Sequence, residues 1–214
     1  IGNDTTLCRR VITRGACERI AKKAFEIARL RNGKKKVTAI HKANVMRITD
    51  GLFASVCRET AKQYPDIAYN ELYVDAASMR LIKEPQVFDV LCTCNMFGDI
   101  LSDEAAQLIG GLGMAPGANI GDNFVLYKTI HYSATNRTCK HLANSISMKL
   151  SKKMMLEWLG EKYNDKKCLQ AGKAIESGVV YALRNGQTVP DCGGNTTTVG
   201  MAEAIAAALT VKTG

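Results

Sequence analysis

Two aspartates near the middle of the chain have the spacing and the chemistry of a divalent-cation site. Asp99 and Asp103 are four residues apart, so they would share one face of a helix. Two carboxylates on one face repel each other, and a helix N-terminus or a hard cation such as Mg²⁺ would relieve that repulsion. By spacing alone, the pair could also be a capping Asp99 and a solvent-facing Asp103. Its place just after a predicted strand and beside a glycine-rich turn favours the cation site.

Lys42 and Asp75 each follow another predicted strand. A desolvated lysine near acidic groups and a substrate hydroxyl is suited to accept a proton. Alone, such a lysine is also typical of a surface cation, and such an aspartate is typical of a helix cap. These two residues can act with Asp99 and Asp103 only if the sheet brings the ends of their strands together.

The elements that must position these residues follow from the hydrophobic periodicity. Predicted helices cover residues 13–28, 50–65, 76–82, 99–109, 142–159, 166–183 and 198–209, and predicted strands cover residues 37–40, 69–74, 88–92 and 124–130. Strands and helices alternate in the first half, which predicts an α/β fold. The second half is mostly helical, and we expect a domain boundary near Pro116–Gly117.

Composition excludes some classes of protein and leaves others open. No apolar run is long enough to span a membrane. The net charge is +9, which a solvated surface explains. The basic run Arg31–Lys36 lacks the interleaved aromatic residues typical of nucleic-acid binding, so we do not expect nucleic acid as a partner. The eight cysteines form no CxxC pair. We expect Cys17, Cys57 and Cys92 to be buried thiols in a reducing compartment.

Known catalytic motifs are absent apart from the acidic helix. The glycines near residue 111 do not form a dinucleotide-binding fingerprint, because the helix precedes them and Pro116 stands where a glycine is required. Walker A, HExxH and GxSxG motifs do not occur. The chain opens with Ile1 rather than Met and shows no signal peptide, so we expect an N-terminus that is processed or missing.

Three blocks of this sequence resemble the isocitrate, isopropylmalate and homoisocitrate dehydrogenases. They are residues 37–50 (VTAIHKANVMRITD), Asp75 with its neighbours, and residues 95–121 (NMFGDILSDEAAQLIGGLGMAPGANIG). The likeness is greatest to the mitochondrial NAD-dependent isocitrate dehydrogenase subunits and weakens after Tyr127. It implies the two-domain α/β fold of that family without its N-terminal third. Residues 1–115 would form a small domain for dimerisation and the metal, and residues 116–214 would belong to the large cofactor-binding domain.

The resemblance also implies a site and a reaction. Asp99 and Asp103 would coordinate Mg²⁺ or Mn²⁺ together with Asp75 of a neighbouring subunit. Lys42, also from the neighbouring subunit, would assist the proton transfers, and Asn44 would lie near the nicotinamide ribose or the substrate. The reaction would be the NAD-dependent oxidative decarboxylation of isocitrate in the tricarboxylic acid cycle. A homo- or hetero-oligomer in the mitochondrial matrix is therefore expected.

The cofactor loop of the family has only a partial counterpart here. By resemblance, the NAD-binding residues would be His131, Ser133, Ala134, Asn136 and Asn144. Tyr132 replaces a glycine that permits close backbone approach, Thr135 replaces a proline, and Asn136 replaces an acid that accepts hydrogen bonds from the ribose. Two functions therefore stay open: an active dehydrogenase subunit, and a non-catalytic regulatory or structural homologue.

Overall fold

The computed structural model describes residues 3–130 and 141–211. It divides into two compact units, the first ending at Ala105 and the second beginning at Ala106. This division falls inside helix α4 (Asn95–Leu108), before the boundary expected at Pro116. The assignment of residues 1–115 and 116–214 to a metal-site domain and a cofactor domain stays a prediction.

A three-stranded parallel sheet forms the centre of the first unit, in the order β2–β1–β3. Its strands are β1 (Lys36–His41), β2 (Ala68–Tyr73) and β3 (Val90–Thr93). His41 pairs with Tyr73, and Ile40 pairs with Thr93. The carboxyl ends of all three strands therefore lie at one edge, where ligand sites of parallel sheets are found. The α/β alternation predicted from the sequence is confirmed.

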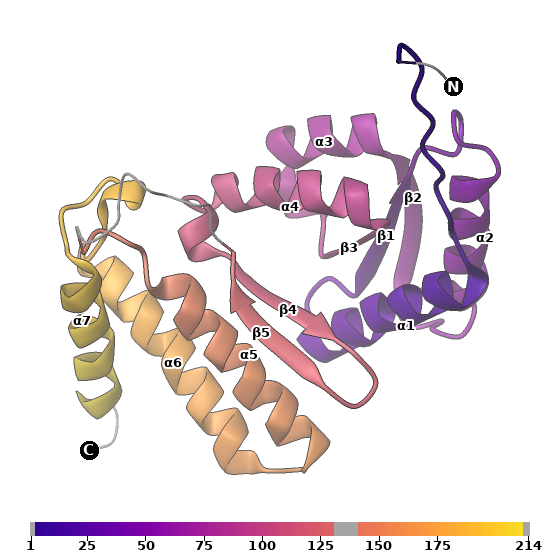
Figure 1. Ribbon diagram of the computed structural model, residues 1–214. Helices are drawn as coiled ribbons and strands as arrows, with labels where there is room; N and C mark the ends of the chain where they lie inside the picture. Colours follow the sequence, from indigo (N-terminus) through magenta and orange to yellow (C-terminus); the bar gives the residue numbers. More distant parts are fainter. Residues whose placement is uncertain (1–2, 131–140, 212–214) are drawn as a thin grey trace. The chain divides into compact units, whose positions relative to one another are not determined.

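Helices cover both faces of this sheet (Figure 1). They are α1 (Arg14–Arg31), α2 (Thr49–Ala61), α3 (Val74–Lys83) and α4. Val37 and Ala39 pack in a core with α1 and α2, whereas Ile40 points to the other face and packs with residues of α3 and α4. This alternation follows from the two-residue period of a strand. The predicted cap of α1 is confirmed, since the Thr13 hydroxyl accepts a hydrogen bond from the Ala16 amide at 3.3 Å.

Helix α4 begins four residues earlier than the sequence predicted. The amide of Gly98 already donates to the carbonyl of Cys94 at 2.9 Å, and Phe97 is buried, so packing draws this segment into the helix. Asp99 is thus the fifth residue of α4, and no acidic side chain lies in its first turn. The helix dipole acts over that first turn, so the expected relief of Asp99 and Asp103 by a helix N-terminus was wrong.

The second unit combines a two-stranded hairpin with three helices. Its elements are β4 (Pro116–Ile120), β5 (Val125–Thr129), α5 (Ile146–Lys162), α6 (Lys166–Arg184) and α7 (Thr198–Val211). The sequence did not predict β4, because Pro116, Gly117 and Asn119 are poor strand formers. Antiparallel pairing with β5 overrides this preference, and the Ser151 hydroxyl of α5 donates to the Lys128 carbonyl at 2.7 Å. The segment at which the sequence placed a domain boundary is therefore the start of a strand.

Short 3-10 turns and buried thiols complete the described parts. The turns cover Pro85–Val87, Leu112–Met114 and Pro190–Cys192. Cys17, Cys57 and Cys92 are buried and free, as predicted. Within residues 3–130 and 141–211, no helix is both long enough and apolar enough to cross a membrane.

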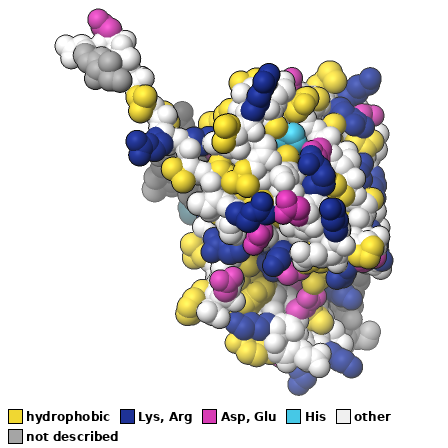
Figure 2. All heavy atoms as spheres, turned by 90° about the vertical axis from the view of Figure 1, so that its right-hand side faces the viewer, with side chains coloured by type: hydrophobic (Ala, Val, Ile, Leu, Met, Phe, Trp, Pro, Cys, Tyr) yellow, Lys and Arg dark blue, Asp and Glu magenta, His cyan; other side chains and the backbone are white. Residues whose placement is uncertain are grey.

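Acidic and basic side chains are interspersed on the face drawn in Figure 2, with no single basic patch. Within the first unit, Arg14 pairs with Glu59 at 2.6 Å, and Arg58 pairs with Glu71 at 2.9 Å. The net positive charge is thus not gathered on this face into the kind of surface that nucleic acid requires.

Candidate active site

Lys42 and Asp75 meet at the edge of the sheet where the parallel strands end. Lys42 directly follows β1, and Asp75 lies in the first turn of α3, directly after β2. The Lys42 Nζ lies 2.6 Å from Asp75 Oδ1. The Lys42 side chain is 24% exposed and that of Asp75 is 67% exposed, so the pair faces solvent at the end nearest the aspartate. The sheet register therefore converts two residues 33 positions apart into one charged pair.

The Asp75 carboxylate is held in its charged form by this contact. The hydrogen bond from Lys42 lowers the pKa of Asp75 below its ordinary value, and a backbone hydrogen bond adds to the effect. Asp75 is thus an anion at neutral pH and has an exposed side available to a further cation.

The backbone that carries Lys42 is fixed by several hydrogen bonds. The Lys42 amide donates to Asp50 Oδ2 at 2.7 Å, and the Ala43 amide donates to His41 Nδ1 at 3.2 Å. The Lys42 carbonyl accepts from the amides of Val45 and Met46 at 2.9 and 2.8 Å. These hydrogen bonds fix the backbone from which the Lys42 side chain extends toward Asp75.

Asn44 lies on the same turn. Its side chain is exposed, and within the described residues no hydrogen bond engages it. The expected place near a cofactor ribose or substrate is sterically open, and the role itself stays a prediction.

His41 belongs to a polar network centred on Glu71 of the neighbouring strand β2. Because His41 Nδ1 accepts the Ala43 amide, its Nε2 carries the proton and donates to Glu71 Oε2 at 3.3 Å. Glu71 also accepts from Arg58 Nε at 3.0 Å and from the Tyr69 hydroxyl at 2.9 Å. Burial raises the pKa of Glu71, but the hydrogen bonds from Arg58, Tyr69 and His41 outweigh it and lower that pKa overall. The network therefore fixes the orientation of the His41 ring, with Nδ1 toward Ala43 and Nε2 toward Glu71.

Two residues that organise this turn, Asp50 and Glu71, were not predicted as site residues from the sequence. Asp50 was expected only to begin a helix, yet α2 has Ile48 at its N-cap position without a side-chain cap, and the Asp50 carboxylate is turned toward Lys42. Glu71 lies in a strand with no motif. No local signal in the sequence identifies either role, because the partners that link them to this turn lie 8 to 40 positions away, namely Lys42 and Arg10 for Asp50 and His41 for Glu71.

Asp99 and Asp103 form an exposed pair of carboxylates on α4. Within residues 3–130 and 141–211, neither carboxylate has a hydrogen-bond donor or a cation in contact. Hard carboxylate oxygens at this spacing fit the ligand preferences of Mg²⁺ or Mn²⁺. In the part of the chain that the structure describes, no three acidic, His or Cys side chains gather into a metal site. Asp75 of the same chain thus does not join this pair, and a third ligand would have to come from elsewhere.

The predicted cofactor residues are only partly visible. His131, Ser133, Ala134 and Asn136 lie outside the described residues, as do Tyr132 and Thr135. Asn144 is described, and its Oδ1 accepts from the Ile146 amide at 3.0 Å at the start of α5. Within the described residues, its amide nitrogen contacts two sulfur atoms, Met114 Sδ at 3.4 Å and Cys192 Sγ at 3.6 Å.

Polar atoms beside Asn144 are incompletely satisfied. Asp191 Oδ1 is buried, and among the described residues no group donates to it. A Cβ added to Gly113 would lie 2.6 Å from Asn144 Cβ and 2.7 Å from Asp191 Oδ2, so only glycine fits there. The Asn144 amide, which donates to weak sulfur acceptors, and Asp191 Oδ1, which has no donor among the described residues, could both bind the polar groups of a nucleotide.

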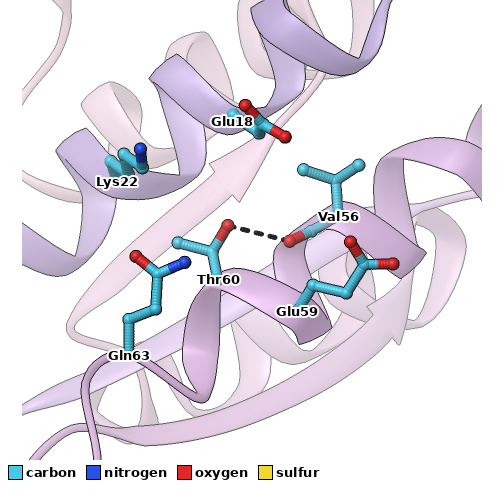
Figure 3. Close-up of a pocket in the computed structure, with 6 residues that line it drawn as sticks. All are labelled: Glu18, Lys22, Val56, Glu59, Thr60 and Gln63. Atoms are coloured by element: carbon cyan, nitrogen blue, oxygen red, sulfur yellow. Dashed lines mark hydrogen bonds between the residues drawn. The ribbon is translucent and has the colours of Figure 1, made fainter.

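A separate hollow lies between α1 and α2, away from these residues (Figure 3). It measures about 140 Å³ and is lined by Glu18, Lys22, Val56, Glu59, Thr60 and Gln63. None of these six is a predicted site residue. Two of its polar groups already bind other groups of the chain: the Thr60 hydroxyl donates to the Val56 carbonyl at 2.9 Å, and the Glu59 carboxylate accepts a hydrogen bond from Arg14. We therefore do not assign a function to it.

Comparison with known proteins gives a consistent set of relatives. Residues 3–207 match the family described as isocitrate/isopropylmalate dehydrogenase. A 3-isopropylmalate dehydrogenase of Archaeoglobus fulgidus is 48% identical over 206 residues, which are 96% of this chain and 61% of that protein. A homoisocitrate dehydrogenase of Methanocaldococcus jannaschii is 49% identical over 193 residues, which are 90% of this chain and 53% of that protein.

A solved structure shares the fold as well. The crystal structure of isocitrate dehydrogenase from Methylococcus capsulatus superimposes with a TM-score of 0.86 at 45% sequence identity, over 94% of this chain and 58% of that chain. This chain therefore spans between 53% and 61% of the length of the three relatives named here.

Proposed function

Because the chain belongs to the isocitrate/isopropylmalate dehydrogenase family, we propose that it forms part of an enzyme that oxidises and decarboxylates a 2-hydroxy acid with NAD. The observation that carries this proposal is the 2.6 Å contact between Lys42 and Asp75 at the ligand-binding edge of the parallel sheet. A cation and an anion are held there on a fixed turn, partly exposed, as proton transfer to a small polar substrate requires.

The residues divide the work as follows. Lys42, as the neutral amine, would accept the proton of the substrate hydroxyl, and the resulting ammonium would donate a hydrogen bond to Asp75. Asp99 and Asp103 offer two oxygen ligands on one face of α4. When bound, Mg²⁺ or Mn²⁺ would act as a Lewis acid toward the substrate oxygens, and NAD would accept the hydride.

We further propose that the site is shared between subunits. Within the described residues, Asp75 does not gather with Asp99 and Asp103 into a metal site, so one chain alone supplies an incomplete ligand set. Helices α3 and α4 also expose apolar side chains, namely Met79, Ile82 and Ile100, each at least 60% accessible. A second subunit covering these helices would bury apolar surface and bring Lys42 and Asp75 of one chain to Asp99 and Asp103 of the other.

Isocitrate is the substrate that we propose first, from the resemblance of the sequence motifs. The relatives named above include enzymes named for 3-isopropylmalate, homoisocitrate and isocitrate, so a panel of these three acids is the appropriate test. Those relatives are archaeal and bacterial proteins. A place in the mitochondrial matrix and in the tricarboxylic acid cycle therefore rests on the motif resemblance alone.

A second candidate function is a non-catalytic subunit of a larger assembly. The cofactor loop favours it, because Tyr132 and Asn136 replace residues suited to close approach and to ribose recognition. This candidate predicts no NAD binding, which calorimetry on the assembled protein measures directly. Saturable NAD binding would contradict it.

The test of the first candidate is formation of NADH by the assembled protein. We expect NADH to appear with one of the three acids, only when Mg²⁺ or Mn²⁺ is present, and to stop when a chelator is added. Turnover that persists with chelator, or the absence of turnover with all three acids in a folded assembly, would refute the proposal.

A further inference from the structure

Asp50 is a fully buried carboxylate that the proposed chemistry does not use. A buried charge is tolerated only where partners neutralise and hydrogen-bond it. Asp50 divides its two oxygens between two donors: Oδ1 accepts from Arg10 Nη1 at 2.6 Å, and Oδ2 accepts from the Lys42 amide at 2.7 Å. One of these donors supplies the neutralising charge, and the other is the backbone of the proposed proton-transfer residue.

Arg10 ties this carboxylate to a further part of the first unit. It lies ahead of α1, 40 positions from Asp50, and its guanidinium carbon is 5.5 Å from the ring centroid of Phe97 in α4. Arg10 Nη1, the nitrogen that binds Asp50, is also 2.8 Å from Met46 Sδ, within the turn that follows Lys42. The Arg10–Asp50 pair thus joins the Lys42 turn, the start of α2 and the start of the helix that carries Asp99 and Asp103.

We propose that Asp50, held by Arg10, is the positioning residue that sets the direction in which Lys42 leaves the sheet. This positioning role rests on the proposed function, in which Lys42 transfers a proton. His41 supports the next amide along the chain, but its bond to Ala43 spans 3.2 Å, longer than the bond from the Lys42 amide to Asp50. The charged acceptor at 2.7 Å is the stronger anchor, because hydrogen bonds to ionised groups are shorter and stronger than neutral ones.

Asp50→Asn is the informative substitution, because it keeps the shape and removes one acceptor. An asparagine has a single oxygen, so it can accept from Arg10 or from the Lys42 amide but not from both. Its NH₂ group must then face the other donor. One of the two bonds is lost, and the Lys42 turn is released from Arg10 in either case.

The readout is the acetylation rate of Lys42 by an N-hydroxysuccinimide ester of acetate, followed by peptide mass spectrometry on the full chain. Lys22 and Lys62 are exposed and serve as internal references in the same molecule. Loss of a hydrogen bond to a charged group predicts that the rate for Lys42, relative to these references, rises about tenfold. The matched control is Glu59→Gln, which removes the exposed Arg14–Glu59 pair from the same helix and should leave the relative rate unchanged.

Arg10 variants keep the proposal testable if Asp50→Asn fails to fold. Arg10→Lys retains a cation for Asp50 and should raise the relative rate less than Arg10→Met does. In a folded Asp50→Asn or Arg10→Met protein, an unchanged relative rate for Lys42 would overturn the inference.

Kinetics separate this inference from the proposed function. In an active assembly, Asp50→Asn should lower kcat while the KM for the hydroxy acid changes little, because the substrate ligands are intact. A higher KM with an unchanged kcat would overturn the positioning role. If the unmodified assembly shows no turnover, the proposed function fails, and the labelling result still decides whether Asp50 positions Lys42.

Discussion

Replacement of Lys42 by methionine should separate stability from activity. The methionine keeps most of the aliphatic stem and removes the ammonium that lies 2.6 Å from Asp75. Asp75 is 67% exposed, and solvent-exposed ion pairs contribute about 0–1 kcal/mol, so the free energy of unfolding should fall by less than about 1 kcal/mol. A positioned acid or base contributes about 10²–10⁴-fold to rate, so kcat should fall by at least about 100-fold.

Urea denaturation and NADH formation by the same preparations measure the two quantities. Arg14→Met is the matched control, because Arg14 also makes a 2.6 Å ion pair with an exposed carboxylate, that of Glu59. It should change stability by a similar small amount and leave kcat unchanged. The reasoning is refuted if Lys42→Met keeps kcat within a few-fold of the unmodified protein, or if it destabilises the fold by more than about 2 kcal/mol.

Three further changes test other parts of the structure. Ile40→Ala should destabilise the first unit by about 2–5 kcal/mol in urea, because the Ile40 side chain of β1 is fully buried against the helices α3 and α4; a loss below about 1 kcal/mol would mean that this core is misplaced. Asp103→Asn should weaken Mg²⁺ binding in calorimetry without loss of stability, since its carboxylate has no partner in the described residues to lose; unchanged Mg²⁺ affinity would remove it from the site. The lowered pKa of Glu71 stabilises the fold at pH values above the pKa of this group in the unfolded chain, about 4.3, and this contribution is lost as pH falls through the pKa in the folded chain. Glu71→Gln should therefore reduce the loss of stability below about pH 4. An unaltered dependence of stability on acid pH would contradict the network.

The sequence predicts the parts of the site that depend on local order. Strand periodicity places Lys42 and Asp75 just beyond strand ends, and the rule that parallel strands end at one edge then brings them together. The pair at Asp99 and Asp103 follows from helical spacing alone. These features need only short-range patterns and one topological rule.

Other features depend on contacts that no local pattern contains. The sequence around Asp50 predicts the start of a helix, and only the fold shows that Asp50 binds Arg10, which lies 40 positions away. Strand β4 forms against its own propensity because β5 pairs with it. The early start of α4 follows from the burial of Phe97. In each case tertiary packing overrides or redirects a local preference.

Subunit complementation tests the shared site most directly. Lys42→Met and Asp103→Asn chains, each inactive alone, would be co-expressed with different tags and purified as mixed oligomers. If the site takes Lys42 and Asp75 from one chain and Asp99 and Asp103 from the other, each mixed dimer has one intact site of two. Because purification through both tags isolates the mixed dimers, NADH formation per dimer should recover to about one half of the unmodified level. Mixed oligomers no more active than either variant alone would contradict the account.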